Sequence, residues 1–511
     1  MDTKALRQKI LDLAIRGKLV PQDPNDEPAS VLLERIREQK KQMVKEGKLK
    51  VKDIKNDTII FVGEDNLHYE KFQDGTVKCI EDEIPFDVPE GWSWARLKHI
   101  CMMAAGKAKP SDQIKPEPFE GCYPCFGGNG IRGYVDDYNQ NGTFSIVGRQ
   151  GALCGNINIA SDKFYATEHA VVTTLFDGID FNWSNYTLEA LRLNEYATGA
   201  AQPGLSVANV LNVFVPVPPT QEQIHIGHQI AKSINIIENI IYEKEDLQNL
   251  ISVAKSKILD LAIRGKLVPQ DPNDEPASVL LERIRAEKEE LIKQGKIKRD
   301  KKETIIFRGD DNSYYEKFAD GRSRCIDSEI PFDLPDGWQY ERLGNICTVA
   351  RGGSPRPIED YLTNDDNGLN WIKIGDTEQG GKYIYSTKEK IRQEGLVKTR
   401  YVESGDFLLT NSMSFGRPYI LRIDGCIHDG WLVIGNTETV FEQNFLYYLL
   451  SSTTMYNSLS SLAVGSTVKN LKSDSVKSLL VPIPPFKEQG IIATKVETLF
   501  NTILPIEKNL S

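Results

Sequence analysis

The sequence predicts an α+β fold: two α+β domains separated by two long antiparallel helical regions, related by a circular pseudo-twofold symmetry. Three observations lead to this prediction. A helical segment occurs twice in identical form, two dissimilar strand-rich inserts lie between the repeated blocks, and the two ends of the chain carry complementary parts of one helical pattern. The chain has 511 residues, which is too long for a single ordinary core.

The chain contains a long internal repeat. Residues 9–37 and 257–285 are identical over 29 positions. The similarity continues in EIPFDVPEGW at 83–92 and EIPFDLPDGW at 329–338. A duplicated gene drifts unevenly, but drift alone would not leave one block identical and its neighbour unrecognisable. We therefore expect a frame that keeps a shape or a partner, and inserts that each meet a different demand.

The inserts end at a second repeated motif. VPVPPTQEQ at 215–223 matches VPIPPFKEQ at 481–489, whereas residues 93–198 and 339–464 show little similarity to each other. The frame therefore surrounds two divergent domains.

A long helix follows the first of these motifs. Residues 221–267 contain no proline, and apolar residues recur with the alternating spacing of a coiled coil. The apolar positions are Ile230, Ile234, Ile237, Ile241, Leu247, Ile251, Ala254, Ile258 and Leu261. About 45 helical residues would form a rod of roughly 70 Å. A core-facing helix of a globular domain is the alternative, and the length favours a rod that spaces two domains.

Shorter elements complete the frame. A second helix is expected at 276–294, ending at Gly295, with a twin at 28–46 ending at Gly47. A hairpin follows each helix, with turns at Asp74-Gly75 and Asp320-Gly321. Residues 487–511 repeat the first part of the long helix, and residues 1–19 supply its last part. If the chain ends meet, they complete a second copy of the rod.

These elements divide the chain into seven parts. They are an N-terminal helical segment (1–50), a hairpin linker (51–90), a first insert domain (91–215), a central helical region (216–295), a second hairpin linker (296–336), a second insert domain (337–481) and a C-terminal helix (482–511).

Both inserts alternate short strands with turns and then end in a helix. In the first insert we expect strands at 144–151 and 163–176 and a helix at 183–196. In the second we expect strands at 370–376, 405–412 and 416–424 and a helix at 443–450.

Residues suited to catalysis are scarce. The glycine-rich GGNGIRG at 127–133 is not followed by a helix, which favours a turn over a phosphate cradle. Cys122 and Cys125 lack a second pair with zinc-ligand spacing. Neighbouring carboxylates such as Asp136 and Asp137 are most simply solvated. No Walker lysine motif, methyltransferase motif or zincin helix occurs, so we expect no catalytic residue, metal site or cofactor in this chain.

Composition sets further limits. The net charge of −10 argues against DNA binding, although the two inserts carry little of it. No apolar run approaches the roughly 20 residues of a membrane span, and the N-terminus lacks an apolar signal core. The eight cysteines are scattered. A cytoplasmic protein without disulfides or a membrane anchor is expected.

The layout resembles that of the specificity subunit of type I restriction–modification systems, in which helical regions separate two variable target-recognition domains. Stretches that are similar to the family are PEGWSWARL (89–97), PDGWQYERL (335–343), GGNGIRGYVDDY (127–138), IVGRQGALCGNI (146–157), ATEHAVV (166–172), GDFLL (405–409), SFGRPYI (414–420) and the motifs at 215–223 and 481–489. The resemblance covers nearly the whole chain.

The resemblance implies a role in defence against foreign DNA. Each recognition domain would read one half of a bipartite, asymmetric double-stranded DNA target, and the rods would set the unread spacer. Two methyltransferase subunits would dock on the frame and bring S-adenosylmethionine. Motor-nuclease subunits would bring ATP and magnesium. The chain itself would be non-catalytic and hold no cofactor.

Polar side chains in the inserts are the candidates for DNA contact, because Arg and Lys suit guanine and phosphate and Asn and Gln suit adenine. They are Lys107, Lys109, Asn129, Arg132, Arg149, Gln150 and His169 in the first domain, and Arg351, Ser354, Arg356, Lys373, Asn411, Ser412 and Arg417 in the second. The repeated frame residues Arg16, Lys18, Arg35, Arg264, Lys266 and Arg283 are the candidates for partner docking. A non-catalytic adaptor whose two inserts bind proteins is the alternative function.

Overall fold

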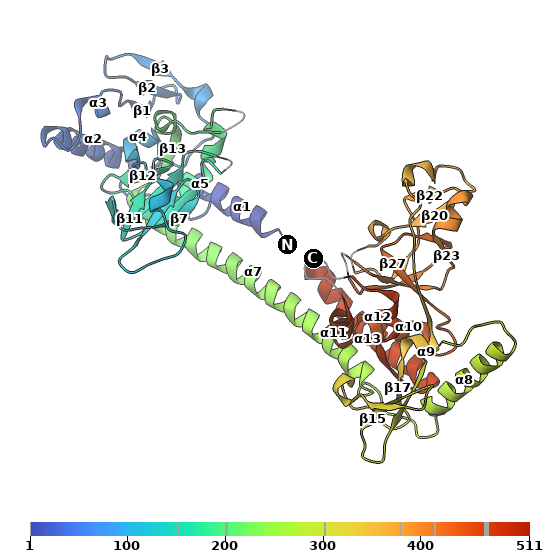
Figure 1. Cartoon of the computed structure of the whole chain (residues 1–511). Helices are drawn as coiled ribbons and strands as arrows, with labels where there is room; N and C mark the ends of the chain where they lie inside the picture. The colour runs from blue at the N-terminus through green and yellow to red at the C-terminus, as the bar shows by residue number, and fades with distance from the viewer. Residues whose placement is uncertain are drawn as a thin grey trace. The chain divides into compact units, whose positions relative to one another are not determined.

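The computed structural model describes residues 2–151, 153–199, 203–300, 303–378, 380–412, 415–463 and 470–510. The chain forms two compact α+β units, Met1–Glu243 and Lys244–Ser511. The long helix α7 (Thr220–Ile263) begins in the first unit and ends in the second (Figure 1). None of the described residues forms a helix long and apolar enough to span a bilayer. The predicted two-domain α+β fold with a long central helix is confirmed.

The frame of the first unit consists of short elements around the start of α7. Helices α1 (Thr3–Ile15) and α2 (Ala29–Lys45) precede a three-stranded sheet, and β4 (Ser93–Arg96) pairs with β13 (Phe214–Val217). The sheet comprises β1 (Ile59–Val62), β2 (His68–Lys71) and β3 (Val77–Cys79). The predicted hairpin is therefore only part of this sheet, because β1 adds a third strand before it.

The second unit repeats this frame. Helix α8 (Ala277–Lys293) corresponds to α2, and β17 (Gln339–Arg342) pairs with β28 (Leu480–Ile483). Its three-stranded sheet comprises β14 (Thr304–Arg308), β15 (Tyr314–Phe318) and β16 (Ser323–Cys325). The last turns of α7 take the place of α1, and the C-terminal helix α13 (Phe486–Leu510) takes the place of the start of α7.

A glycine ends the repeated helix in each unit. The long helix stops at Ile263, before the predicted residue 267, because Gly265 adopts a left-handed backbone with φ of 65°. A Cβ atom there would lie 2.4 Å from Cγ of Pro335. Gly17 in the first unit has φ of 64°, and its Cβ would lie 2.3 Å from Cγ of Pro89. Only glycine combines this turn with this close approach.

Side chains from distant parts of the repeat join at the start of the next helix. In the first unit, the Gln22 amide donates to the Gly17 carbonyl (2.7 Å) and to Glu222 (3.1 Å). The indole of Trp92 also donates to Glu222, at 2.8 Å. The second unit has the same arrangement with Gln270, Gly265, Glu488 and Trp338. The identical sequence block is therefore matched by identical local geometry.

A buried ion pair ties the three-stranded sheet to the domain in each unit. Arg96 donates to both carboxylate oxygens of Glu70 (2.8 and 2.7 Å), and Arg342 donates to both oxygens of Glu316 (3.1 and 3.0 Å). Burial alone would raise the pKa of either glutamate, but the hydrogen bonds from arginine and threonine outweigh it and lower both pKa values to about 2.

The two frames differ at a titratable position beside this ion pair. His99 lies beside this ion pair in the first unit, where the Arg96 amide donates to its Nδ1 at 3.1 Å and the Thr58 hydroxyl lies 3.3 Å from its Nε2. Asn345 takes the same place in the second unit and donates to the Thr304 carbonyl at 3.0 Å. Burial lowers the pKa of His99 to about 3, with Lys98 and Lys40 acting in the same direction.

We expect this difference to make the first unit more sensitive to mild acid. Below the ordinary histidine pKa of 6.5 the unfolded chain takes up a proton that folded His99 does not accept, so stability falls as pH drops from 6.5 towards 3. The loss is at most about 1.4 kcal/mol per pH unit. His99→Asn should remove this fall in stability from the first unit above pH 5. Asn345→His should introduce the same fall in the second unit. Hydrogen exchange resolved by unit between pH 7 and 5 measures both, and an unchanged pH slope in His99→Asn would contradict the expectation.

Two sheets and a covering helix form the first insert domain. One sheet has the order β10-β9-β12-β5 and the other β7-β6-β11-β8, with helix α5 (Phe181–Ala190) after the last strand. The strands are β5 (Cys101–Ala105), β6 (Tyr123–Gly127), β7 (Gly130–Val135), β8 (Gln140–Asn141), β9 (Phe144–Gly148), β10 (Ile157–Ala160), β11 (Lys163–Ala166) and β12 (Ala170–Leu175). The strand predicted at 163–176 is thus two strands in different sheets. The helix predicted at 183–196 begins at Phe181, ends at Ala190 and is followed by a 3-10 turn.

The second insert domain has the same two-sheet plan. Its sheets have the orders β18-β27-β24-β25-β21 and β19-β22-β20-β26-β23. The strands are β18 (Thr348–Arg351), β19 (Leu362–Thr363), β20 (Leu369–Ile372), β21 (Tyr383–Ile384), β22 (Glu389–Ile391), β23 (Arg400–Val402), β24 (Phe407–Thr410), β25 (Pro418–Leu421), β26 (Gly425–Ile427) and β27 (Trp431–Gly435). The strand predicted at 370–376 ends at Ile372, where a 3-10 turn begins.

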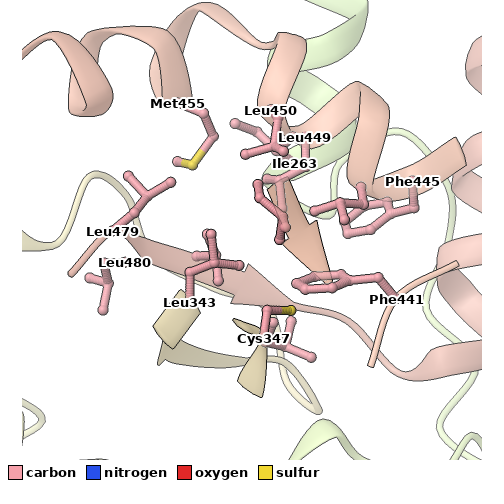
Figure 2. Packing of buried hydrophobic residues seen from close by; sticks show 14 of the residues in the cluster. Ile263, Leu343, Cys347, Phe441, Phe445, Leu449, Leu450, Met455, Leu479 and Leu480 are labelled. Carbon is pink, nitrogen blue, oxygen red and sulfur yellow. The ribbon is translucent and has the colours of Figure 1, made fainter. Parts of the chain in front are cut away.

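A single apolar core joins the frame of the second unit to its insert domain. Helix α10 (Gln443–Ser451) supplies Phe445 and Leu449, and helix α11 (Thr453–Leu462) supplies Met455. Figure 2 shows these side chains facing Leu343 and Ile263, which belong to the frame. The insert is therefore fixed rigidly to its frame within the unit.

The long helix α7 has a helical neighbour in the second unit. There α7 and α13 run antiparallel, with Lys255 to Glu507 at 2.5 Å and the Gln248 side-chain amide donating to the Leu510 carbonyl at 3.5 Å. In the first unit, Leu11 of α1 belongs to the same apolar core as Ile226 and Ile230 of α7, and Arg7 of α1 pairs with Glu189 of α5 at 2.8 Å. The circular arrangement of the whole chain, with its ends meeting, stays a prediction.

Candidate nucleic-acid interface

Three loops of the first insert domain meet at one end of its β10-β9-β12-β5 sheet. They follow β5, follow β9 and precede β12, and backbone hydrogen bonds join them. The amides of Gly106 and Lys107 donate to the carbonyls of Ala170 and Ala166, both at 3.0 Å, and the Arg149 amide donates to the His169 carbonyl at 2.9 Å. We call residues 106–110, 149–151 and 167–169 loop cluster 1.

The second insert domain contains the same junction. The amide of Gly352 donates to the Trp431 carbonyl (3.0 Å), that of Gly353 to the Ile427 carbonyl (3.2 Å), and that of Asn411 to the Gly430 carbonyl (3.0 Å). Loop cluster 2 is therefore residues 352–356, 411–412 and 428–430. The two domains share this geometry without recognisable sequence similarity, because only backbone atoms make the bonds.

Loop cluster 1 contains five of the predicted DNA-binding residues, Lys107, Lys109, Arg149, Gln150 and His169, and a sixth, Asn129, lies beside it. The β6–β7 turn carries Asn129, which accepts a hydrogen bond from the Asn156 amide at 2.9 Å. A Cβ atom on Gly128 would lie 3.2 Å from the Gln150 carbonyl, so this turn packs against the cluster. The glycine-rich segment is a turn, as the sequence predicts. Lys107 is exposed on the cluster itself.

Lys109 and Arg132 have protein partners of their own. The Lys109 ammonium lies 2.6 Å from Asp137 and over the ring of Tyr165, with only 10% of the side chain exposed. Arg132 on β7 is exposed and donates to the Ser111 hydroxyl at 2.8 Å. A role of Lys109 in DNA contact would require exchange of this ion pair, and both assignments stay predictions.

Loop cluster 2 is organised around one carboxylate, Asp429. The Ser354 hydroxyl donates to it at 2.8 Å, and Arg356 forms an ion pair with it at 3.4 Å. Arg351 and Asn411 donate to its backbone carbonyl at 2.9 and 2.7 Å. Burial would raise the pKa of Asp429, but the Ser354 hydrogen bond and the nearby positive charges lower it.

The other predicted DNA-binding residues of the second domain, Lys373, Ser412 and Arg417, lie in or around loop cluster 2. Lys373 forms an ion pair with Glu389 at 2.6 Å, and Arg417 is exposed after β24. Ser412 is half-buried. Sequence reasoning missed Asp429 and its counterpart Glu168, because an acid looks unsuited to DNA and only the strand register shows that both stand at one position.

The candidate docking residues form two matching sets. Arg16 pairs with Asp12 at 2.9 Å and lies over the ring of Phe86. Arg35 pairs with Glu27, and Lys18 is exposed. The second unit repeats the arrangement with Arg264 on Asp260 and Phe332, Arg283 on Glu275, and exposed Lys266. Each unit therefore presents the same charged surface.

Residues 89–250 and 335–511 each match the family described as type I restriction modification DNA specificity domain. The chain belongs to this family. The matches begin at the two repeated Pro-x-Gly-Trp segments and run through both insert domains. The function of the chain is therefore recognition of a DNA target within a type I restriction–modification system.

Individual relatives agree with this assignment. The chain is 26% identical to the specificity subunit of the type I restriction enzyme EcoEI of Escherichia coli, over 99% of this chain and 90% of the relative. It is 29% identical to the EcoAI specificity subunit of the same organism, over 68% and 63% of the two chains. A 196-residue stretch is 37% identical to the EcoprrI specificity subunit of Escherichia coli, covering 38% of this chain and 47% of the relative.

The fold also matches a solved structure. A chain from a study of the assembly and conformational transition of the type I R-M system superposes with a TM-score of 0.51 at 15% identity, over 83% of this chain and 94% of that one. This likeness supports the α+β two-domain fold described above.

Proposed function

We propose that the chain is a non-catalytic subunit in which each loop cluster reads one half of a bipartite, asymmetric double-stranded DNA target. One observation carries this proposal. The two domains present the same backbone junction but different side chains: Arg149, Gln150 and His169 in one, and Asn411, Ser412 and Gly430 in the other. A shared scaffold with different polar groups suits two readers that approach DNA alike and recognise different bases.

We further propose that two methyltransferase subunits dock on the repeated frame. Two equal docking surfaces suit two copies of one partner related by a pseudo-twofold axis. The methyltransferase would supply S-adenosylmethionine, and motor-nuclease subunits would supply ATP and magnesium. The complex would act in the cytoplasm, and this chain would hold no cofactor.

Co-expression with the candidate methyltransferase subunit tests the proposal. Mass photometry should show two methyltransferase copies per chain, and sequencing of methylated adenines in the cells should show one split, asymmetric motif that depends on this chain. Cells with the methyltransferase alone are the control. Association without any chain-dependent motif would instead favour the protein-binding adaptor.

The docking surface has its own test. Reversing the charge of both Arg35 and Arg283 to Glu should weaken methyltransferase binding by about tenfold or more, because like charges at an interface oppose association. Lys45→Glu with Lys293→Glu is the matched control, since both lysines are exposed in the last turn of α2 or α8 outside the identical block. Full partner binding by the Arg35 and Arg283 variant would place the docking surface elsewhere.

A further inference from the structure

Both domains place a carboxylate at one position of the loop cluster. The carbonyls of Ala170 and Trp431 accept corresponding bonds, from Gly106 and Gly352. Counting back two residues from these positions gives Glu168 in the first domain and Asp429 in the second. The loops on either side keep the same hydrogen bonds, so the two carboxylates occupy equivalent places. We call this place the acid position.

In the second domain, the carboxylate at the acid position binds an arginine. Arg356 lies 3.4 Å from Asp429, while 81% of its side chain is exposed. One edge of the guanidinium therefore faces the carboxylate, and its remaining donors face solvent. Ser354 and Arg351 bind the same residue and keep it in place. A guanidinium held in this way is prepared for a two-bond contact with O6 and N7 of guanine.

The acid position of the first domain lacks these partners. The same backbone bonds align Ala108 with Ser354 and Pro110 with Arg356, so neither a hydroxyl nor a guanidinium reaches Glu168 from this loop. Oε1 of Glu168 lies 3.3 Å from Nε2 of His169. Oε2 is covered and has no hydrogen-bond partner among the described residues.

A carboxylate without a cation is unfavourable on a surface that approaches phosphates. It becomes favourable where it accepts a hydrogen bond from an exocyclic amine, and in the major groove only cytosine N4 and adenine N6 offer one. Glu168 has an unused acceptor, and 39% of its side chain is exposed. Asp429 is already occupied by the chain's own donors.

We propose that the acid position determines specificity in both half-sites and is used in two ways. In the first domain Glu168 itself accepts from the amine of a cytosine or adenine. In the second domain Asp429 is a positioning residue that holds Arg356 against a guanine. This inference rests on the proposed function, because it requires that the loop clusters face DNA.

Methylation mapping of variants close in size to the wild type tests the proposal. Glu168→Met keeps the length of the side chain but removes the carboxylate acceptor, so it should relax the motif at one base pair of the first half-site, with methylation of the other bases there rising about 5- to 150-fold relative to wild type. The wild-type base at that pair, cytosine or adenine, shows which amine is read. Asp429→Asn and Arg356→Lys should both relax one guanine of the second half-site, and Asp429→Glu should retain it.

Two controls make each result decisive. Glu195→Gln removes an exposed carboxylate of the first domain outside the loop cluster and should leave the motif unchanged. A wild-type complex without any motif would overturn the proposed function itself. A normal wild-type motif that stays unchanged in Glu168→Met, Asp429→Asn and Arg356→Lys would overturn this inference alone. Loss of all methylation with a lowered melting temperature would show that the acid position only holds the loops together.

Discussion

Replacing Arg342 with alanine is expected to lower the free energy of unfolding of the second unit by about 3–5 kcal/mol, because it removes the buried cation from a buried carboxylate and leaves only the more exposed Arg324 beside it. Glu316 is 4% exposed, and two of the hydrogen bonds that hold its negative charge come from Arg342. Arg342 also donates to the Ser478 carbonyl and to Glu329, both at 2.8 Å. The substitution thus disconnects β15 from the insert domain.

Hydrogen exchange resolved by unit measures this effect. The first unit should be unchanged, because its own pair, Arg96 and Glu70, is intact. Arg322→Ala is the control, since the Arg322 side chain is 82% exposed and its ion pair is with Asp320 in the hairpin turn, so its loss should cost less than about 1 kcal/mol. Equal losses in the two variants would contradict the assignment.

The same ion pair predicts how the second unit responds to acid. The folded-state pKa of Glu316 is about 2, below the ordinary 4.5. Its stabilising contribution is therefore present above pH 4.5 and is lost as pH falls from 4.5 towards 2. Arg342→Ala should reduce this acid-dependent part, because only Arg324 and Thr304 then hold the carboxylate, so the difference in stability between the variant and the wild type should narrow as pH falls from 4.5 towards 2.

Trp183→Ala should have a comparable effect on the first unit, about 3–5 kcal/mol, because it deletes a large side chain from a packed core. Trp183 is 1% exposed and shares a core with Val147 and Val171 of the sheet that carries loop cluster 1. The Asp180 carboxylate accepts from its amide at 2.8 Å and caps α5. Loss of this packing should also abolish methylation of the whole motif, since both half-sites are needed.

Denaturant unfolding of the Trp183 variant, followed by unit, gives the magnitude. Phe445→Ala is the matched variant of the second unit, because Phe445 stands at the same place after the helix cap Glu442 and is also 1% exposed. Each substitution should destabilise its own unit. Tyr196→Ala is the control, since Tyr196 is 45% exposed. A loss below about 1 kcal/mol in Trp183→Ala would show that α5 is not part of the core.

The frame could be predicted closely because its signals are local. The apolar spacing of the long helix and the exact repeat gave helix bounds that differ from the structure by a few residues. The extra strands β1 and β14 were missed. Both contain the short apolar stretch Ile-Ile-Phe, which is too short to show the alternation of apolar and polar residues that distinguishes a strand from a loop. The strands β11 and β12 were wrongly predicted as one strand at 163–176, because the turn between them at Thr167–His169 contains neither glycine nor proline.

The site was less accessible to sequence reasoning for a physical reason. Residue type identified Asn129, Arg149 and Gln150 as hydrogen-bonding groups, and the structure brings them together. Their convergence, however, depends on backbone bonds from Arg149 to His169 and from Gly106 to Ala170, which leave no trace in residue type. The equivalence of Glu168 and Asp429 follows only from those bonds.

These backbone bonds also bear on how such a protein changes over generations. Because main-chain atoms make the hydrogen bonds that the two loop clusters share, exposed side chains such as Gln150 can be replaced at little cost in folding stability. Mutations that alter the recognised word are then separated from mutations that damage the fold. A chain of this kind can therefore change the DNA sequence that it recognises by substitutions at exposed loop positions while both loop clusters keep their shared backbone bonds.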